Sequence, residues 1–339
     1  GGTIGSDLAR QIAIHGPAHI SLLDNGELAL YRIDLEIDEN WPNLSRSAIL
    51  GDVRDGTRLA TVFQREQPEL VFHAAAFKHV PMVEENPNEG VLTNVMGTTN
   101  VARACLASEV AVMVQISTDK AVNPTSIMGA TKRIAEMICQ GLSLTSASSR
   151  FVTVRFGNVL GSRGSVVPLF QRQLARGGPL TVTDRDVTRY FMTAREAVEL
   201  VLQATAATPR DVESGKIFVL DMGQPVRILD LARQMIRLAG FTPDVDIPIT
   251  FTGLRPGEKL YEEMLHDGEA PQPTNLEGVN LASPRVIDYE LLSDQVDKLS
   301  RAAKSRDTAQ TIALIRYLVP ELQNGGDNVM KETTVAQAE

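Results

Sequence analysis

In "QISTDKAVNPTSIMGATKRIAE", residues 115–136, a predicted buried strand is followed directly by a predicted helix, which is the clearest indication of the fold class. The apolar run "AVMVQIS" (Ala111–Ser117) is typical of a strand in a parallel sheet. The following segment "TSIMGATKRIAEMICQGL", which begins at Thr125, has the apolar spacing of a helix. Such a unit predicts an α/β fold with a doubly wound parallel sheet.

Three side chains suited to acid–base chemistry follow this strand directly. Thr118, Asp119 and Lys120 come at its carboxyl end, which is where ligands bind in an open α/β sheet. Singly, Thr118 or Asp119 could only cap a turn, and Lys120 could only be solvated. Together, they are interpreted as catalytic candidates.

Composition excludes several other classes of protein. The chain has 339 residues, a net charge of -9 and a pI near 5.2, whereas a general nucleic-acid surface needs a basic footprint. Its 2 cysteines, Cys105 and Cys139, show no metal-type spacing, which favours a reducing, cytoplasmic compartment. No signal peptide and no apolar run of about 18 residues appears in the sequence.

The first residues, "GGTIGSDL", resemble a glycine-rich phosphate loop that runs into a helix. In such a loop the glycines let the backbone approach a pyrophosphate, and the helix amino terminus supplies N–H donors. Gly2, Thr3, Ile4 and Gly5 are therefore predicted to bind a dinucleotide. The first strand and the first glycine of the motif are expected upstream of Gly1.

The next segments continue the pattern of a Rossmann-like, dinucleotide-binding sheet. "HISLLD" (His19–Asp24) predicts a strand that ends in an acidic residue, where a carboxylate accepts hydrogen bonds from an adenosine ribose and favours NAD over NADP. The alternative for Asp24 is a turn with Asn25 and Gly26. "AILGDVRD" predicts a strand that ends at Asp52 and Val53, beside the cofactor.

A further strand, Val71–His73, leads to small side chains at Ala74, Ala75 and Ala76, against which a cofactor can lie. A helix is predicted from Gly56 to Glu66 and another over "GVLTNVMGTTNVARACLAS". Lys78 and His79 are interpreted as lining the substrate site. Asn94, in the second helix, is predicted to be a buried amide that supports the site.

After residue 165 the strand–helix alternation loosens, which predicts a second, smaller mixed α/β domain. We expect a cofactor domain over residues 1–165, a mainly substrate-binding domain over 166–323 with some segments returning to the first, and a disordered tail over 324–339. The string "RFVTVRFGNVLGSRGSVVPLF" predicts another strand and a loop that carries Arg155, Asn158 and Arg163. "DIPITFTGLRPGEKLYEEML" predicts a strand joined to a helix through Arg255–Lys259.

Taken together, these residues resemble the extended short-chain dehydrogenase/reductase family and, within it, the polysaccharide-biosynthesis UDP-N-acetylglucosamine 4,6-dehydratases. The resemblance covers nearly the whole chain and rests on the strings "GGTIGSDL", "LLD", "GDVRD", "FHAAAFKHVPMVEENP", "NVMGTTN", "ISTDKAVNPTSIMGATKR", "RFGNVLGSRGSVVPLF" and "GLRPGEKLYEEML". It implies NAD as cofactor, a UDP-sugar substrate and a homo-oligomer. Larger relatives carry membrane helices ahead of this part. The chain is therefore expected to be either a catalytic piece of such a protein, on the cytoplasmic side of the inner membrane, or a truncated soluble protein.

The chain departs from the family pattern at one position. Members usually have a tyrosine four residues before the helix lysine; here Met128 stands there and Lys132 is retained. A thioether cannot transfer a proton. The membrane-associated subgroup is similar in having methionine, and this similarity predicts retention of configuration at C5.

The resemblance implies oxidation at C4, loss of water across C5 and C6, and hydride return to C6. Lys120 is expected to take the C5 proton and Asp119 to protonate the leaving hydroxyl. For the C4 hydroxyl proton, Lys132, Thr118 with a water and Asp119 remain alternatives, and Lys132 also holds the nicotinamide ribose. The residues expected to hold the nucleotide sugar are Lys78, His79, Asn94, Asn158, Arg189, Arg255 and Glu258.

Two other functions are compatible with the sequence. A nucleotide-sugar epimerase or simple oxidoreductase of the same fold would oxidise C4 without the acid and base for elimination, so the Asp119–Lys120 pair discriminates against it. A catalytically silent nucleotide-binding protein would account for Met128 at the tyrosine position.

Overall fold

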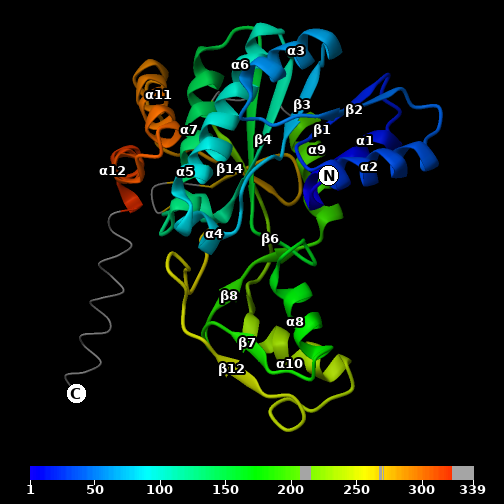
Figure 1. The fold of residues 1–339 in the computed structure, drawn as a ribbon. Helices are drawn as coiled ribbons and strands as arrows, with labels where there is room; N and C mark the ends of the chain where they lie inside the picture. Colours follow the sequence, from blue (N-terminus) through cyan, green and yellow to red (C-terminus); the bar gives the residue numbers. More distant parts are fainter. Residues whose placement is uncertain (207–214, 267–268, 270, 323–339) are drawn as a thin grey trace.

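A computed structural model describes residues 1–206, 215–266, 269 and 271–322. The chain forms a large lobe built on a central sheet and a small lobe below it in Figure 1. Within the described residues, no helix is long and apolar enough to cross a membrane. The predicted tail, 324–339, lies outside the described residues.

The central sheet of the large lobe has the strand order β13-β14-β10-β5-β4-β3. Strands β3, β4, β5 and β10 are parallel, and β14 and β13 add an antiparallel edge. This parallel-dominated sheet confirms the predicted fold class. The strands span Leu70–His73 (β3), Val112–Thr118 (β4), Arg150–Phe156 (β5), Ile217–Leu220 (β10), Gln272–Pro273 (β13) and Val279–Ala282 (β14).

Strands β1 (Ile20–Asp24) and β2 (Arg46–Leu50) form a separate two-stranded parallel sheet in the same lobe. β1 pairs only with β2, and β3 pairs only with β4, among the described residues. In the common doubly wound order 3-2-1-4-5-6, the first strand would lie between the strands that correspond to β1 and β3. Among the described residues, the parallel pairing is therefore interrupted between β1 and β3.

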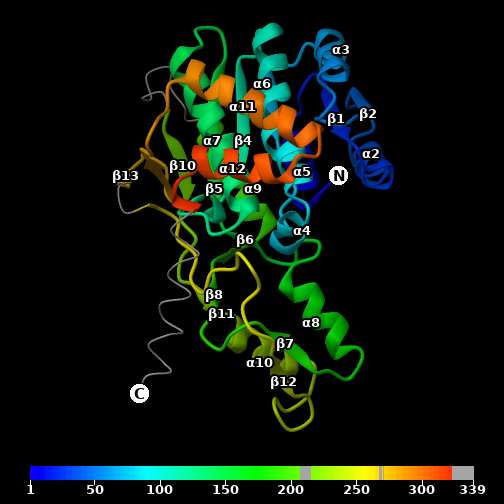
Figure 2. The ribbon, with the colours of Figure 1, turned by 60° about the vertical axis from the view of Figure 1, so that its left-hand side comes forward.

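Helices cover both faces of the central sheet. On one face, α3, η1, α6, α7, α11 and α12 enclose the largest apolar core; on the other, α1 and α9 pack together against β4, β5 and β10. Figure 2 shows α11 and α12 crossing in front of α7. The bounds are Thr3–Ile14 (α1), Glu27–Asn40 (α2), Gly56–Glu66 (α3), Val80–Glu85 (α4), Pro87–Gly90 (α5), Val91–Met96 (η1), Gly97–Ala107 (α6), Ile127–Thr145 (α7), Ala194–Ala206 (α9), Tyr289–Lys304 (α11) and Thr308–Leu318 (α12).

The small lobe has its own apolar core, centred on Phe170, Leu180 and Ile236. Helices α8 and α10 pack there against β7, which pairs in parallel with β12. Segments β8 and β11 pair antiparallel, and β6 pairs with β9 near the junction of the lobes. The bounds are Asn158–Val159 (β6), Val166–Leu174 (α8), Leu180–Val182 (β7), Thr188–Arg189 (β8), Phe191–Met192 (β9), Val226–Arg227 (β11), Ile228–Leu238 (α10) and Ile249–Phe251 (β12).

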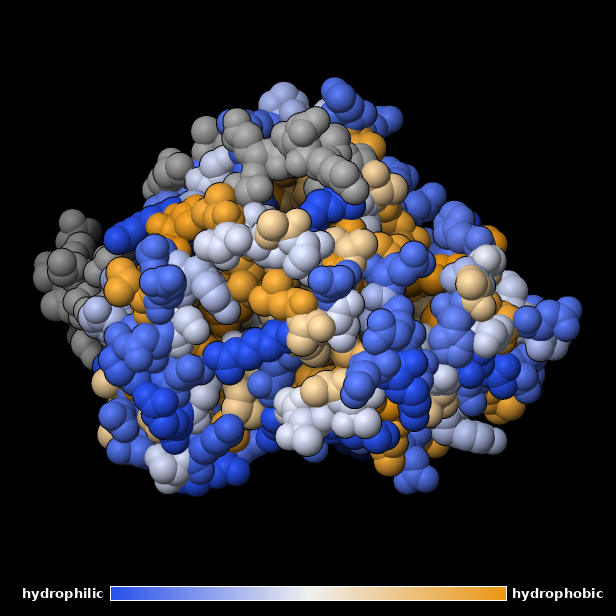
Figure 3. Space-filling model, turned by 90° about the horizontal axis from the view of Figure 1, so that it is seen from above, coloured by the Kyte–Doolittle hydropathy of each residue, from blue (hydrophilic) through white to orange (hydrophobic). Residues whose placement is uncertain are grey.

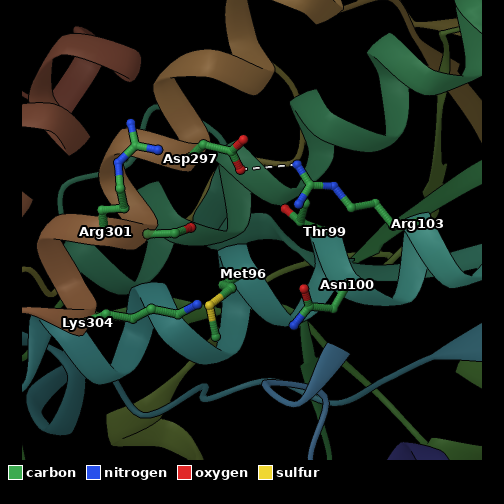
Figure 4. Close-up of a pocket in the computed structure, with 8 residues that line it drawn as sticks. Met96, Thr99, Asn100, Arg103, Asp297, Arg301 and Lys304 are labelled. Atoms are coloured by element: carbon green, nitrogen blue, oxygen red, sulfur yellow. Dashed lines mark hydrogen bonds and ion pairs between the residues drawn. The ribbon is translucent and has the colours of Figure 1, made fainter. Parts of the chain in front are cut away.

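Helices α11 and α6 are joined at the surface by an ion pair between Arg103 and Asp297, at 3.1 Å. A crevice of about 150 Å³ lies beside this pair and also receives Lys304 (Figure 4). Seen from above, the molecule shows hydrophilic residues with hydrophobic groups scattered between them (Figure 3). The principal opening of the molecule lies elsewhere, between the lobes.

Several predicted elements are confirmed, among them the strand ending at Asp24 and the helix Gly56–Glu66. Two predicted elements differ from the structure. β2 ends at Leu50, before Asp52 and Val53, which lie in the following turn. No helix follows Arg255–Lys259: residues 252–266 form a loop without regular structure, because their side chains serve contacts between the lobes rather than one helix face. The predicted helix through Asn94 is confirmed, and its part Val91–Met96 is a π-helix that continues into α6.

Candidate active site

A cleft of about 1850 Å³ lies between the lobes, at the carboxyl ends of the parallel strands. All residues of β1 and β3 line it, so it also extends into the interruption of the sheet. Its other walls come from the start of α1, the turn after β4, helix α7, and the small-lobe segments around Arg189 and Glu258. Residues far apart in the sequence therefore meet at one opening.

The glycine turn lies at the amino end of α1 and lines the cleft. Gly2 caps the helix in extended backbone, with φ -72° and ψ 176°, and no side chain in the described part of the chain caps the first helical N–H groups. A Cβ placed on Gly2 or Gly5 would meet nothing within 4 Å. These positions, with Thr3 and Ile4, leave open space and free N–H donors, which suits an anionic ligand.

Asp24 ends β1 at the cleft, with its side chain 24% exposed. Its Oδ1 accepts from the Gly26 N–H at 2.7 Å, so the turn considered for Asp24 is present. Its Oδ2 lies 2.7 Å from the amino group of Gly1. The Asp24 carboxylate thus accepts a hydrogen bond within the turn and also lines the cleft.

The rest of this wall is formed by small and apolar residues. Val53, Ala74, Ala75 and Ala76 line the cleft beside Asp52. The Asp52 carboxylate accepts from the Arg54 N–H at 2.9 Å and from the Asn25 amide at 3.3 Å. The structure brings these predicted cofactor residues to the same side of the cleft as the glycine turn.

Helix α7 supplies Met128 and Lys132, which both line the cleft. The Ser126 hydroxyl caps this helix by accepting from the Gly129 N–H at 3.0 Å. Lys132 Nζ donates to the Ile116 carbonyl at 2.7 Å, and burial lowers the pKa of Lys132 to about 8. Nearby, burial and the charge of Lys132 lower the pKa of His73 to about 3. A fraction of Lys132 is therefore neutral near physiological pH.

The turn after β4 holds the predicted acid and base side by side. Thr118 Oγ1 donates to Asp119 Oδ1 at 2.7 Å, and Lys120 Nζ donates to the same oxygen at 3.0 Å. Asp119 is fully buried, and its Oδ2 has no hydrogen-bond partner among the described residues. Lys120 Nζ also donates to Asn158 Oδ1 at 3.0 Å. We call Thr118, Asp119, Lys120, Asn158 and Glu262 the acid–base corner.

Glu262 is the member of this corner that sequence reasoning missed. Its Oε1 lies 3.5 Å from Lys120 Nζ and 3.6 Å from Arg189 Nε. Burial favours a lower pKa for Lys120, but the carboxylates of Asp119 and Glu262 outweigh it and raise the pKa. No spacing rule distinguishes Glu262 from the neighbouring Glu263, because both belong to a loop whose path the sequence pattern does not predict.

Arg189 and Glu258, both predicted to bind the nucleotide sugar, are paired with each other at 3.1 Å. Arg189 is buried and also donates to the carbonyls of Thr188 and Leu260, at 2.7 and 3.3 Å. Its donors are thus engaged largely within the small lobe, where they fix the loop that carries Glu258. Arg255, by contrast, is exposed at the mouth of the cleft.

Lys78 and His79 lie on the loop after β3, across from the segment 162–164. Lys78 Nζ donates to Ser162 Oγ at 3.3 Å. A Cβ on Gly164 would lie 2.6 Å from His79 Cε1, so the imidazole packs directly on that glycine. Burial is the main cause of a lowered pKa for both Lys78 and His79.

Two polar groups beneath the cleft support its walls. Asn94 is 1% exposed; its amide accepts from the Phe77 N–H at 2.8 Å and donates to Thr131 at 2.9 Å, so it holds the Lys78 loop on α7 rather than facing the cleft. Arg155 was expected on a loop but lies within β5, fully enclosed, and pairs with Glu136 at 2.9 Å and Glu269 at 2.9 Å. It belongs to the support of the site and not to its surface.

Comparisons with known proteins show which family this chain is similar to. Residues 1–284 match the family model described as "Polysaccharide biosynthesis protein". The capsular polysaccharide biosynthesis protein CapD of Staphylococcus aureus is 51% identical over 270 residues, which is 79% of this chain and 44% of that protein. The chain thus spans less than half the length of that relative.

Two further relatives align with this chain over most of their own length. A UDP-N-acetylglucosamine 4,6-dehydratase (inverting) of Campylobacter jejuni is 35% identical over 71% of this chain and 69% of that protein. A UDP-glucose 4-epimerase of Rickettsia rickettsii is 36% identical over 86% of each.

A solved dTDP-glucose 4,6-dehydratase of Streptomyces venezuelae, with NAD bound, has a TM-score of 0.64 at 22% identity, covering 76% of this chain and 84% of that one. At that identity the likeness establishes the fold alone. The family match spans well over half of the chain and agrees with the parallel-dominated fold. This chain belongs to the polysaccharide biosynthesis protein family, within the extended short-chain dehydrogenases/reductases.

Proposed function

We propose that this protein is an NAD-dependent UDP-N-acetylglucosamine 4,6-dehydratase. The observation that carries the proposal is the Asp119–Lys120 pair, joined at 3.0 Å in the turn after β4 with Lys120 lining the cleft. Oxidation at C4 alone needs no such pair, whereas elimination of water needs both an acid and a base. The family membership and the dehydratase relative support the same reaction.

The cofactor side of the cleft suits NAD. Open space at Gly2 and Gly5 and the free N–H groups of α1 suit a pyrophosphate, the Asp24 carboxylate suits ribose hydroxyls, and Ala74–Ala76 leave room for a ring system. When bound, NAD supplies the acceptor for the hydride from C4 and its later return to C6. In this arrangement, Lys132 would hold the nicotinamide ribose.

For the first proton transfer, Lys132 is the best candidate among the alternatives. Met128 cannot accept the C4 hydroxyl proton. Lys132 can accept it in its neutral form, and a pKa near 8 makes that form available near pH 7 to 8. Thr118, which donates to Asp119, is suited to orient the C4 oxygen.

For the elimination, we assign Lys120 as the base for the C5 proton and Asp119 as the acid for the C6 hydroxyl. With a raised pKa, Lys120 rests as an ammonium beside Asp119. Passage of the shared proton from Lys120 Nζ to Asp119 Oδ1, over 3.0 Å, yields a neutral amine and a carboxylic acid. The amine can then take the C5 proton while the acid donates to the departing hydroxyl, which leaves as water.

The nucleotide part of the substrate is assigned to the small lobe. We assign Arg255, at the mouth of the cleft, to the phosphate oxygens and Glu258, paired with Arg189, to the uridine ribose hydroxyls. Lys78, His79 and Asn158 would line the sugar, with Asn94 supporting them from below. We also retain the division into a cofactor domain, 1–165, and a mainly substrate domain, 166–323, and a homo-oligomeric state.

The biological setting is proposed from the relatives. Capsule or another surface polysaccharide is the favoured product class, with lipopolysaccharide and protein glycosylation as related possibilities. One relative, 42% identical, is named a membrane protein, which supports anchoring of a longer protein at the cytoplasmic side of the membrane.

The second candidate is a nucleotide-sugar 4-epimerase. The epimerase relative, which is as similar as the dehydratase relative and covers more of the chain, favours it. An epimerase would return the hydride to C4 and release an isomer of the substrate. Asp119 and Lys120 would then have no role in turnover.

Incubation with UDP-N-acetylglucosamine and NAD, followed by mass spectrometry, separates the candidates. A dehydratase forms a product lighter by one water, and an epimerase forms an isomer of unchanged mass. An isomer alone would establish the epimerase, and the absence of any product with NAD bound would indicate a silent nucleotide-binding protein.

A further inference from the structure

The Glu262 carboxylate is buried in an unusual setting. Its side chain is 3% exposed, yet it lines the cleft, and its Oε2 has no hydrogen-bond partner among the described residues. A buried carboxylate oxygen without a donor is unfavourable. Because this carboxylate lies beside Lys120, we infer that it serves the site.

The charges that face the Lys120 amine come from several elements. Asp119 of the same turn lies at 3.0 Å and Glu262 of the loop 252–266 at 3.5 Å. Arg189 of β8 and Lys78 of the loop after β3 add positive charge nearby. The neutral oxygen of Asn158 completes the surroundings at 3.0 Å. The amine is thus held between two carboxylates that belong to different parts of the fold.

We propose that Glu262 is a positioning residue of the acid–base corner: from the small-lobe loop, its carboxylate holds the Lys120 amine in place and keeps it an ammonium until the proton passes to Asp119. The proposal deepens the proposed function and rests on it for the catalytic consequence. The contact itself is a property of the fold. A purely structural Glu262, serving only Arg189 at 3.6 Å, would not affect Lys120.

The neighbouring Glu263 provides a matched control. Its side chain is 44% exposed and pairs with Lys259 Nζ at 2.8 Å and with the Asn123 amide at 3.1 Å, away from Lys120. Glu262→Gln and Glu263→Gln each remove one negative charge from adjacent positions of one loop. Only the first removes it from beside the Lys120 amine.

The direct test is nitrogen NMR of the NAD-loaded protein labelled with 15N-lysine. The Lys120 Nζ signal is assigned from its loss in Lys120→Arg and is then followed against pH. We expect the Lys120 titration midpoint to fall in Glu262→Gln and to stay unchanged in Glu263→Gln, because loss of a nearby carboxylate makes the ammonium easier to deprotonate. An equal midpoint in Glu262→Gln and in the unaltered protein overturns the proposal.

The pH dependence of kcat/KM gives the catalytic readout. If the pair needs the shared proton, activity falls at high pH as Lys120 loses it, and Glu262→Gln should move this alkaline fall to lower pH. Absence of dehydratase product in the unaltered protein, together with a lowered midpoint in Glu262→Gln, would remove the proposed function and leave the positioning role intact. A lowered midpoint with an unmoved alkaline fall would overturn the link to catalysis.

Discussion

The two sides of the cleft are built in different ways. On the cofactor side, backbone, small residues and the residues of β1 and β3 form the wall, and the pair between Arg10 and Glu36 is half-exposed. On the other side, the acid–base corner and its support are networks of buried charges that join β4, α7, β5 and the small-lobe loop. Shape and open backbone donors suit a dinucleotide, whereas proton transfer needs charges whose pKa values are held by neighbours.

The largest expected effect is on turnover. Asp119→Asn and Lys120→Ala should each reduce kcat by about 100-fold to 10,000-fold, since each removes one partner of a general acid–base pair. Lys304→Ala, on the surface of α11, serves as the control and should leave kcat unchanged. Product formation from UDP-N-acetylglucosamine measures the effect, and near-normal rates in both site variants would remove the assigned roles.

The next effect concerns the support of the acid–base corner. Arg155→Met removes the guanidinium that lies between the buried carboxylates of Glu136 and Glu269 and leaves Glu136 with Arg133 alone, which should cost about 3–5 kcal/mol of unfolding free energy. Arg10→Met breaks the half-exposed pair with Glu36 on the cofactor side and should cost about 1 kcal/mol or less. Urea unfolding at pH 7 compares the two; equal losses would contradict the contrast between the sides.

Lys132→Met tests the cost of a buried ammonium. The folded pKa of about 8 lies below the ordinary 10.5, so the unfolded chain holds more protons between these pH values and stability rises with pH across that window. Well below pH 8, the free-energy cost of burying the Lys132 ammonium is fully present. At pH 7 the variant should therefore be more stable by about 2 kcal/mol: a roughly 3 kcal/mol penalty is removed, and about 1 kcal/mol is lost with the Ile116 hydrogen bond.

Thermal unfolding at pH 7 and pH 10 measures this difference. The gain of Lys132→Met over the unaltered protein should shrink toward the higher pH. If Lys132→Met is less stable than the unaltered protein at pH 7, burial of the Lys132 ammonium does not lower the stability of the fold.

The smallest effects separate two glycines. Gly164 has φ +72° and packs on the His79 ring, so Gly164→Ala should cost about 1–2 kcal/mol of stability. Gly2→Ala meets no atom within 4 Å and should change stability by less than about 0.5 kcal/mol, while it weakens NAD binding by filling the space above α1. Unfolding and NAD titration together check both; unchanged NAD affinity in Gly2→Ala would argue against a pyrophosphate at this turn.

The sequence predicted the parts of the molecule that follow local rules. The strand–helix unit around Ser117 and the helix Gly56–Glu66 have clear periodicity and caps, and the structure confirms them. The positions of Arg155 and Glu262 were not predictable in this way. Arg155 lies in β5 and pairs with Glu136 of helix α7. Glu262 lies beside Lys120 because residues 252–266 form a loop instead of the helix that their spacing predicted.

The sequence also did not predict which site residues pair with each other. Asp119 and Lys120 are neighbours in the chain, but their shared hydrogen bond depends on the turn after β4. Arg189 and Glu258 are far apart in the sequence and use each other as partners. Motifs thus indicated which residue types gather at the cleft, whereas tertiary contacts determine their charge.

Elimination of water from a C4-oxidised sugar by Lys120 and Asp119 can be followed by NMR of the reaction with UDP-N-acetylglucosamine and NAD in deuterated water. We expect a 4-keto-6-deoxy product that carries deuterium from solvent. We also expect retained configuration at C5, because of Met128, although the dehydratase relative is named inverting. Inversion at C5 would remove the Met128 interpretation alone; a C4 epimer without solvent deuterium would contradict elimination by Lys120 and Asp119.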